Sequence, residues 1–476
     1  MPDSPHAASV CMPLWEHNVA YEKGDQAVIS AFNSGYPRFF MNPLVTQLRA
    51  KLAQRVGLSA DDSLLLPTES SAKRCAEYVR HRGFPNAKVS ATDEGVWLVH
   101  SRGESTALRE FWQHGGEILS SRTAELCLAG GSQSITATAA KEALRERIAE
   151  LQHVAAGDVY LFPSGMAAIY AAWRITQNDA APIQFGFPYV DTFKILERFG
   201  TVEPWFFPNG SAADIEELSQ RLQSQSASAL FCEVPGNPLL TTPDVPRLCE
   251  LARAHDFAMV IDDTLGAMLN VDARPYADLI TTSLTKFFSG QGDVLGGSLC
   301  LVPDSPNYPQ LKARLEAEYE DLFCDADAEV LLANSVNVRQ RVTAINRSTK
   351  ALVEALRGHP KVEALHYPSE DTQKNFEALR DSHFATGGYG GLLSVVPKNA
   401  EQAAPKIYDA LQVCKGPNLG TNFTLCCPYT ILAHYEELDF ATDCGVSPYL
   451  LRISVGLEPT DWIVERVLSA LAAGDS

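Results

Sequence analysis

The chain has 476 residues, of which 46% are hydrophobic, and a formal net charge of −19 from 39 Lys and Arg against 58 Asp and Glu. A chain of this length can bury large cores and divide into two or three domains. Its acidity argues against nucleic acid or an anionic membrane as a partner, so an anionic small ligand must be bound by a local group of residues.

Cysteine usage and the N-terminal sequence exclude other classes of protein. The 11 cysteines include no Cys-x-x-Cys pair, which predicts reduced thiols rather than disulfides or a zinc site. No spacing of His, Asp and Glu indicates another kind of metal site. The first residues have neither a basic start nor an apolar run, and no later apolar stretch is long enough to span a membrane. We therefore expect a cytoplasmic protein that does not enter a membrane.

Regular patterning begins at residue 157, after a less regular N-terminal part. The predicted elements are a strand at 157–162, an alanine-rich helix beginning in SGMAAIYAAWRI, a strand at 229–234, a helix at 245–255, and strands at 257–262 and 278–283. This alternation is typical of an α/β fold, in which helices cover both faces of a mostly parallel sheet and ligands bind at the carboxyl ends of the strands.

The rest of the chain has a different pattern. After residue 305 a helical stretch leads to a smaller α+β part, which closes with YLLRISVGLEPTDWIVERVLSAL. We therefore divide the chain into an N-terminal extension and arm at 1–156, a large α/β domain at 157–305, and a linking helix with a C-terminal α+β domain at 306–476.

Polar residues stand at the ends of the predicted strands. Asp262 ends the strand FAMVID, where a carboxylate is unfavourable unless a cation meets it. Lys286 follows the strand DLITTS, and the hydroxyls of Ser283 and Thr285 beside it suit phosphate oxygens. Because such strand ends meet at one edge of the sheet, these residues are expected to share one pocket.

Three more residues complete a recognisable set. Gly165 and Met166 begin a helix whose bare N–H groups can bind a phosphate, and Tyr189 supplies an aromatic face. A lysine, a carboxylate, a phosphate site and a stacking ring predict pyridoxal phosphate (PLP). Lys286 would hold it as a Schiff base, and Asp262 would keep its pyridine nitrogen protonated.

The run GQGDVLGG after Lys286 could be taken for a dinucleotide-binding loop, but neither its spacing nor its place in the chain agrees with that motif. Instead we expect its glycines to leave room for the cofactor and the substrate, where Cβ atoms would intrude. These glycines are Gly290, Gly292, Gly296 and Gly297.

Five ordered motifs resemble those of one family. They are FPSGMAAI, EVPGNPLL, VIDDTL, SLTKFFSGQGDVLGG and LLRISVGLEP. In these motifs the chain is similar to the Cys/Met-metabolism PLP-dependent enzymes, and with GYPRFFMNP it resembles the fungal branch of the cystathionine γ-synthases. The resemblance implies the fold type I architecture, PLP as cofactor, and a homotetramer built as a dimer of dimers.

The resemblance also implies residue roles. Lys286 and Tyr189 would be catalytic, with Tyr189 stacked on the cofactor ring, and Asp262 would pair with the pyridinium. Phosphate binding would fall to Gly165, Met166, Ser283 and Thr285, Asn237 would lie near the cofactor's 3-hydroxyl, and Arg452 would bind the substrate's α-carboxylate. Strand alternation supports the last role, because Arg452 points away from its two apolar neighbours.

In two places the chain departs from the family pattern. The family takes a Tyr-x-Arg pair from the neighbouring subunit to the phosphate. Tyr36 and Arg38 supply both residue types but lie far ahead of the phosphate turn, whereas Arg122 lies nearer but lacks the tyrosine, so both alternatives stay open. In NLGTNF, which corresponds to S-L-G-G-x-E, Asn418 replaces serine and Phe423 stands near the expected acidic residue, so both are expected to reshape the substrate end.

The implied reaction is γ-replacement on O-acyl-L-homoserine, in the fungal branch the O-acetyl ester, through a vinylglycine ketimine. Cysteine as acceptor would give cystathionine. A carbon nucleophile, such as the enolate of a β-keto acid, could meet the same electrophile, and a cystathionine β- or γ-lyase would need no second substrate. A non-catalytic regulator would not need Lys286, Asp262 and Arg452 together.

Overall fold

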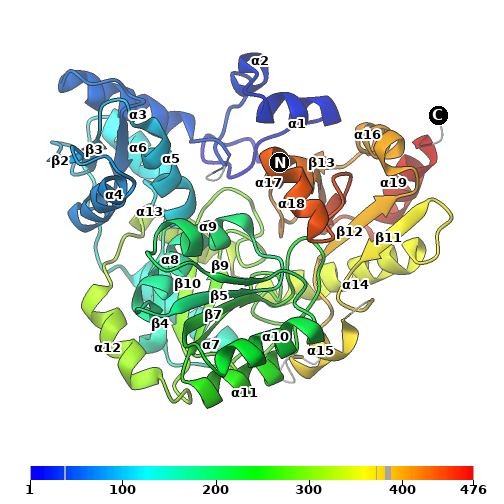
Figure 1. The fold of residues 1–476 in the computed structure, drawn as a ribbon. Helices are drawn as coiled ribbons and strands as arrows, with labels where there is room; N and C mark the ends of the chain where they lie inside the picture. The colour runs from blue at the N-terminus through cyan, green and yellow to red at the C-terminus, as the bar shows by residue number, and fades with distance from the viewer. Residues whose placement is uncertain (1, 37–38, 371, 381–386, 475–476) are drawn as a thin grey trace.

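The computed structural model describes residues 2–36, 39–370, 372–380 and 387–474, and the structural statements below concern these residues. Three sheets form within them, one after another along the chain. The N-terminal helices α1 (Trp15–Glu22) and α2 (Gln26–Ile29) lie at the top of the molecule as drawn in Figure 1, on the same side as α17 (Tyr429–His434).

The largest sheet has seven strands in the order β4-β10-β9-β8-β7-β5-β6. They are β4 (Val159–Phe162), β5 (Ala181–Phe185), β6 (Trp205–Phe207), β7 (Ala227–Glu233), β8 (Ala258–Asp262), β9 (Leu279–Ser283) and β10 (Gly297–Leu301). Its strands are parallel except β10, which runs antiparallel to β4 and β9. The predicted mostly parallel sheet is confirmed, and its predicted strands coincide with β4, β7, β8 and β9.

Both faces of this sheet are buried, which explains the unbroken apolar runs in its strands. In β7, Leu230 and Cys232 pack into one core, and Ala229 and Phe231 pack into the other. The first core includes α7 (Ala139–Gln152), α10 (Ala212–Leu222) and α11 (Val245–His255), and the second includes α8 (Gly165–Thr176), α9 (Val190–Arg198) and α12 (Tyr308–Glu318).

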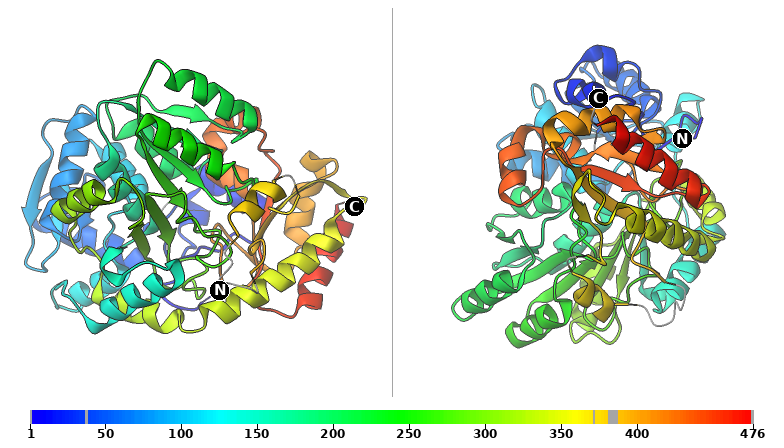
Figure 2. Two further views of the ribbon diagram at one scale, coloured as in Figure 1. Left: turned by 90° about the horizontal axis from the view of Figure 1, so that it is seen from below. Right: turned by 90° about the vertical axis from the view of Figure 1, so that its right-hand side faces the viewer.

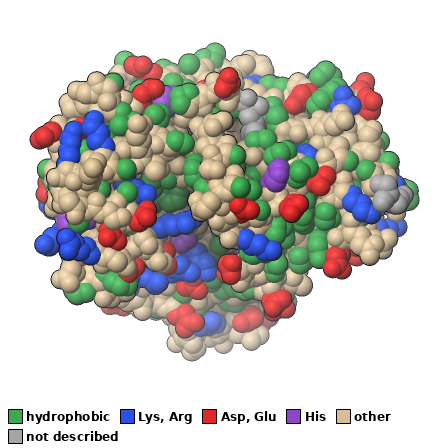
Figure 3. Space-filling model, turned by 90° about the horizontal axis from the view of Figure 1, so that it is seen from above, with side chains coloured by type: hydrophobic (Ala, Val, Ile, Leu, Met, Phe, Trp, Pro, Cys, Tyr) green, Lys and Arg blue, Asp and Glu red, His purple; other side chains and the backbone are tan. Residues whose placement is uncertain are grey.

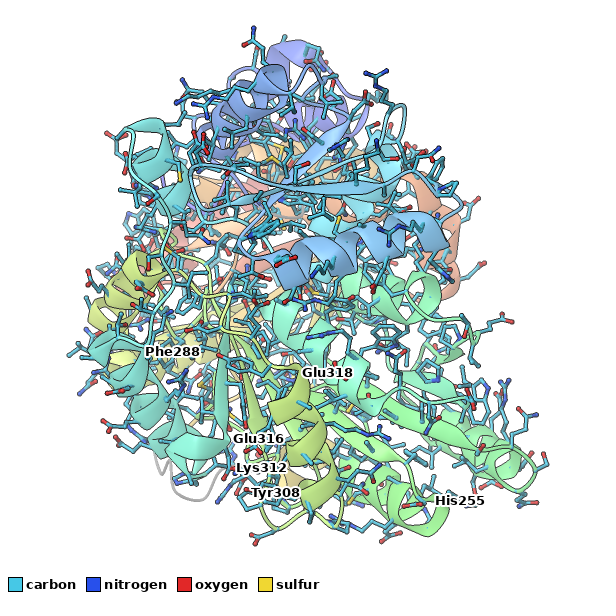
Figure 4. All side chains as sticks on the ribbon, turned by 90° about the vertical axis from the view of Figure 1, so that its left-hand side faces the viewer. His255, Phe288, Tyr308, Lys312, Glu316 and Glu318 are labelled. Atoms are coloured by element: carbon cyan, nitrogen blue, oxygen red, sulfur yellow. The ribbon has the colours of Figure 1, made fainter. Side chains whose placement is uncertain are left out.

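Helix α8 begins directly after β4, because Ser164 caps it by accepting the N–H of Ala167 at 3.1 Å. Its outer side is tied to α12 by an ion pair of 3.2 Å between Arg174 and Glu318. Glu318 lies along α12, at the far end from Tyr308 (Figure 4). The start of α8 is therefore fixed by its cap at the end of β4, and its last turn is held against α12.

The C-terminal sheet has the order β11-β12-β15-β14-β13. Its strands are β11 (Val362–His366), β12 (Leu392–Pro397), β13 (Cys414–Lys415), β14 (Leu425–Pro428) and β15 (Leu451–Ser454). The long helix α14 (Val338–Leu356) runs along the central domain toward it (Figure 2), and one face packs on α14, α16 (Ala400–Ala410) and α19 (Thr460–Ala473). Leu451 and Ile453 belong to that face, so Arg452 between them faces the central domain, as the alternation predicted.

The N-terminal third is more regular than its sequence indicates. It contains an antiparallel sheet of order β1-β3-β2 and, at Phe111–Gly115, a π-helical turn that contacts α8 and α9. The elements are α3 (Pro43–Arg55), β1 (Ser63–Leu66), α4 (Glu69–His81), β2 (Lys88–Ala91), β3 (Trp97–His100), α5 (Ser105–Glu110) and α6 (Ser121–Leu128). Each strand is only four residues long, too short for alternation to reveal it.

The remaining helices are α13 (Asp325–Asn334), α15 (Gln373–Ala378) and α18 (Leu438–Asp443). Within the described part of the chain, no helix combines the length and apolar character needed to cross a membrane. The same residues contain no group of three or more His, Cys, Asp or Glu side chains placed to hold a metal ion, and the described cysteines form no disulfide.

The expectation for the glycines after Lys286 is wrong. A Cβ atom at Gly297 would lie 2.1 Å from the carbonyl oxygen of Ser164, and one at Gly290 would lie 2.2 Å from the guanidinium of Arg341. None of the four glycines lines the cavity described below. At Gly290, Gly296 and Gly297 other parts of this chain approach the backbone closely, and Gly292 has a φ of +71°, which favours glycine.

We predict that Gly297→Ala lowers the free energy of unfolding by roughly 2 to 4 kcal/mol, because the new Cβ overlaps the backbone that starts α8. Differential scanning calorimetry of the variant checks this. Gly157→Ala is the matched control, because a Cβ there meets nothing within 4 Å. Equal melting temperatures for the two variants would contradict the prediction.

Candidate active site

One cavity collects most of the predicted site residues at the carboxyl ends of the central strands. Its lining includes Tyr36, Gly165, Met166, Tyr189, Asn237, Asp262, Ser283, Thr285, Lys286 and Arg452. They come from the N-terminal segment, the central domain and the C-terminal domain. Seen from above, Lys and Arg side chains gather beside a hollow in this face of the molecule (Figure 3), although the chain as a whole is acidic.

Lys286 lies in the turn after β9 and is held at its tip. Its Nζ donates hydrogen bonds to the hydroxyl of Tyr36 at 2.8 Å and to Oδ1 of Asn418 at 2.7 Å. The NLGTNF segment can pass this close because Gly420 has a φ of +69°, and a Cβ there would lie 3.0 Å from Cβ of Lys286. Asn418, predicted at the substrate end, therefore contacts the lysine itself.

Asp262 stands at the end of β8 with its carboxylate facing the cavity. Its Oδ1 accepts the backbone N–H of Thr264 at 2.8 Å, and burial raises its pKa above the usual value. The described residues form no ion pair with it, although a buried carboxylate needs a cationic or donor partner. The place is therefore suited to a ligand that brings an N–H.

Glu233 is a site residue that sequence reasoning missed. It lies opposite Asp262 in the β7–β8 register, and its two carboxylate oxygens accept the backbone N–H groups of Tyr189 and Asn237. Burial, followed by the nearby Asp262, raises its pKa to about 8. The sequence signal that could have identified Glu233 was a carboxylate at the end of a buried strand, where EVPGNPLL begins.

The phosphate end is built from α8 and the turn that precedes Lys286. The N-terminus of α8 reaches the cavity with Gly165 and Met166, where a Cβ at Gly165 would lie 2.7 Å from Cβ of Ser283. The hydroxyl of Thr285 accepts the N–H of Gly296 at 3.1 Å. Free helical N–H groups beside two hydroxyls make an anion-binding site.

The N-terminal third also contributes to this end of the cavity. Gly116 has a φ of +67°, and its carbonyl oxygen accepts the hydroxyl of Ser164 at 2.8 Å. Gln113 lines the cavity two residues before the end of the π-helical turn. No sequence pattern indicated either residue, because the turn that carries them has no periodic signature.

Tyr189 is held by its position at the beginning of α9. It precedes that helix directly, and the second residue of α9, Asp191, is fully buried 2.7 Å from Nδ1 of His114. This contact joins α9 to the π-helical turn. This contact and the hydrogen bond from the N–H of Tyr189 to Glu233 together set the position of the Tyr189 backbone at the cavity wall.

Arg452 is 95% buried but held by neutral groups. Its guanidinium donates to Oδ1 of Asn237 at 3.0 Å and to the carbonyl oxygen of Pro417 at 2.7 Å, and it lies 4.8 Å from the ring centroid of Tyr429. Among the described residues this buried guanidinium has no carboxylate partner, and its charged donors are therefore chemically suited to a carboxylate ligand.

Among the described residues, Arg122 and Phe423 are expected site residues that do not line the cavity. Arg122 forms an ion pair of 2.7 Å with Asp327 and donates to the carbonyl oxygen of Asp293 at 3.0 Å, beside a second cavity. Phe423 is not among the residues that line the first cavity. Arg38 lies outside the described residues. The hydroxyl of Tyr36 accepts a hydrogen bond from Nζ of Lys286 of its own chain, and its expected contact with a neighbouring phosphate stays a prediction.

These residues fit PLP. Asp262 offers the buried carboxylate that a pyridinium N–H requires, and the N-terminus of α8 with Ser283 and Thr285 offers the anion site. Lys286 and Tyr189 line the same cavity, where an amine and an aromatic ring are needed. The donor and acceptor chemistry of the cavity therefore suits the pyridine nitrogen, the phosphate and the aldehyde of the cofactor.

The raised pKa values of the Asp262 and Glu233 carboxyl groups predict that the stability of the cofactor-free protein depends on pH. Burial also raises the pKa of Asp263 to about 7, and the folded state therefore binds protons that the unfolded chain loses near pH 4. This contribution is complete below about pH 4 and is lost as the pH rises through 7 and 8. From pH 6 to pH 9 we expect a loss of roughly 2 to 4 kcal/mol.

Calorimetric melting at the two pH values measures this loss. Glu233→Gln is expected to remove most of it, and the exposed Glu216→Gln is the control that keeps it. If the melting temperature of Glu233→Gln falls between the two pH values as far as that of the wild type does, Glu233 does not cause the loss of stability.

Comparisons with known proteins agree with this geometry. The model of the family described as Cys/Met metabolism PLP-dependent enzyme matches residues 133–472. Cystathionine gamma-synthase of Neurospora crassa is 34% identical over 99% of this chain and 97% of its own length. The cystathionine gamma-synthase-like enzyme iboG2 of Amanita muscaria is 32% identical over 99% of this chain and 95% of its own.

A solved structure shows the same fold. The crystal structure of cystathionine gamma synthase from Xanthomonas oryzae pv. oryzae superposes with a TM-score of 0.63, at 21% identity, over 71% of this chain and 87% of that chain. Both the sheet order and the family match thus confirm the fold type I architecture. The chain belongs to the Cys/Met-metabolism family and is a PLP-dependent enzyme of the cystathionine γ-synthase type.

Proposed function

We propose that this enzyme catalyses γ-replacement on O-acetyl-L-homoserine, with cysteine as the acceptor and cystathionine as the product. The observation that carries the proposal is that Lys286, Asp262 and Arg452 line one cavity, which brings together an amine, a carboxylate suited to the cofactor and a guanidinium suited to an amino-acid carboxylate. Similarity to the Neurospora crassa enzyme along nearly the whole of both chains supports the same reaction class.

PLP, when bound, supplies an electron sink for negative charge at the substrate's α-carbon. Asp262 would hold the ring N–H, and Tyr189 would cover the ring. Ser283 and Thr285, with the N-terminus of α8, would hold the phosphate. Glu233 would keep Tyr189 and Asn237 in place through the two backbone N–H groups that it accepts.

Lys286 would move the protons of the reaction. As a free amine it would take a proton from Cα, and after it has released that proton it would take one from Cβ. The acyloxy group at Cγ could then depart as a carboxylate and the second nucleophile could add there. Lys286 would then return the protons to the same face of the substrate. Arg452 would fix the substrate's carboxylate, so that Cα and Cβ stay within reach of this one amine.

A carbon nucleophile is the second candidate acceptor. Asn418 stands where the family has serine, and its Nδ2 is buried without a hydrogen-bond partner among the described residues. This amide changes the surroundings of Lys286 at the end of the site where the acceptor must approach. An enolate of a β-keto acid would then form a carbon–carbon bond at Cγ in place of the carbon–sulfur bond.

Assembly and location are proposed with the activity. The described cavity is lined by residues from three parts of one chain. From the family resemblance we also propose a homotetramer, built as a dimer of dimers, and a location in the cytoplasm. The ligands are a small amino acid and a second nucleophile, without nucleic acid or a membrane. Light scattering of the active protein tests the tetramer.

Product analysis distinguishes the acceptors. The PLP-loaded protein is incubated with O-acetyl-L-homoserine and equal amounts of cysteine and a β-keto acid, and product masses are read. We expect cystathionine. A carbon–carbon adduct with unused cysteine would replace the first candidate by the second, and a keto acid formed without any acceptor would indicate a lyase. Lys286→Ala should abolish all products, whereas Lys350→Ala, at a side chain 72% exposed, should not.

Arg452→Ala is predicted to lower kcat/KM for the homoserine ester about 100-fold, equivalent to roughly 2.7 kcal/mol, because the substrate carboxylate loses a charged donor. Most of the loss should appear in KM. Arg247→Ala removes an arginine that is 54% exposed and serves as the control. An unchanged KM in Arg452→Ala would remove this residue from the substrate site.

A further inference from the structure

The N-terminal segment 7–18 is docked on both the central and the C-terminal parts of its own chain. The N–H of Ala8 donates to the carbonyl oxygen of Gly292 at 2.7 Å, and the carbonyl oxygen of Met12 accepts the hydroxyl of Tyr408 at 2.7 Å. Ala8 is 2% exposed and Met12 is fully buried. A Cβ at Gly416 would lie 2.2 Å from the carbonyl oxygen of Val10, so the receiving surface is shaped for this segment.

From this docked segment the chain passes through α1 and α2 and returns to the cavity at Tyr36. The backbone of Tyr36 pairs with Phe40, its ring centroid lies 5.3 Å from that of Phe39, and both rings join a core with Tyr429 and Leu432 of the C-terminal domain. Tyr36 is only 7% exposed. Its side chain is therefore fixed by packing and does not hang freely over the cavity.

The hydroxyl of Tyr36 and the amide of Asn418 together constrain the orientation of Lys286. A neutral amine has two N–H groups and one lone pair, and the structure provides two acceptors for those N–H groups at 2.8 and 2.7 Å. With both N–H groups engaged, the lone pair has one direction left.

We propose that Tyr36 is a positioning residue for Lys286 of the same chain, and that the docked N-terminal segment delivers it. The inference rests on the proposed function, because it assigns to Tyr36 the orientation of the amine that moves the protons. It departs from the expectation of a tyrosine that crosses to the neighbouring subunit and binds phosphate. In each active site, Tyr36 and Lys286 would then come from the same chain.

The first test uses Tyr36→Phe, which keeps the ring and removes the hydroxyl. We expect kcat to fall about 10-fold with KM changed less than about 2-fold, because the hydroxyl acts on the amine and not on substrate binding. Tyr276→Phe, which removes a tyrosine hydroxyl outside the cavity lining, should leave both constants unchanged. An unchanged kcat in Tyr36→Phe, or a loss confined to KM, would overturn the proposal.

The second test does not depend on turnover. In cofactor-free protein, a small amine-acylating reagent labels lysines, and peptide mass spectrometry gives the rate at Lys286 relative to the exposed Lys350. Removal of the covering side chain in Tyr36→Ala should raise this ratio about 10-fold. An unchanged ratio would show that Tyr36 does not contact Lys286. The result stands whichever acceptor the enzyme uses, so it separates this inference from the proposed function.

The third test asks whether the two residues act within one chain. Lys286→Ala and Tyr36→Ala chains carrying different affinity tags are co-expressed and purified through both tags. If the contact lies within one chain, the mixed assembly has no site with both residues and stays at the level of Tyr36→Ala. Recovery of fully active sites would show a contact between chains and overturn the proposal. Failure of the tags to copurify would indicate a monomer, which permits only the contact within one chain.

Discussion

The carboxylate of Asp262 at the end of β8 is the constraint on which the site depends. It lies next to Glu233 on the neighbouring strand, so two acidic groups with raised pKa values stand side by side in the cavity wall. Such a pair is unfavourable in the empty protein and becomes favourable when a donor enters. The empty site therefore carries an electrostatic cost, which the packing of the surrounding fold must offset. Binding of the cofactor removes this cost, and its removal adds to the affinity for the cofactor.

Close backbone contacts hold the rest of the site against this carboxylate. β10, the antiparallel strand, lies against the residue that caps α8, and α8 begins against the end of β9. These contacts leave no space for a Cβ at Gly165 or Gly297. The anion site and the lysine turn are therefore parts of one rigid unit, and the distance between them is set by backbone contacts and not by flexible side chains.

Much of the central domain could be predicted from sequence, for a physical reason. Strands buried on both faces give continuous apolar runs, and polar residues such as Asp262 stand out at their ends. Strand alternation likewise placed Arg452 correctly. The N-terminal sheet could not be predicted, because its four-residue strands carry no clear period. The contact of Tyr36 with Lys286 joins positions 250 residues apart, which no local pattern encodes. The role of Glu233 depends on backbone N–H groups, whose direction only the folded chain defines.

The docked N-terminal segment has a consequence for the order of events during synthesis. Residues 7–18 leave the ribosome long before Tyr408 and Gly416, which belong to the surface that receives them. The segment must stay undocked while the central sheet forms, because contacts of such long sequence separation close late. A segment that is translated early thus reaches its place late, and the cavity is complete only after Arg452 has been made.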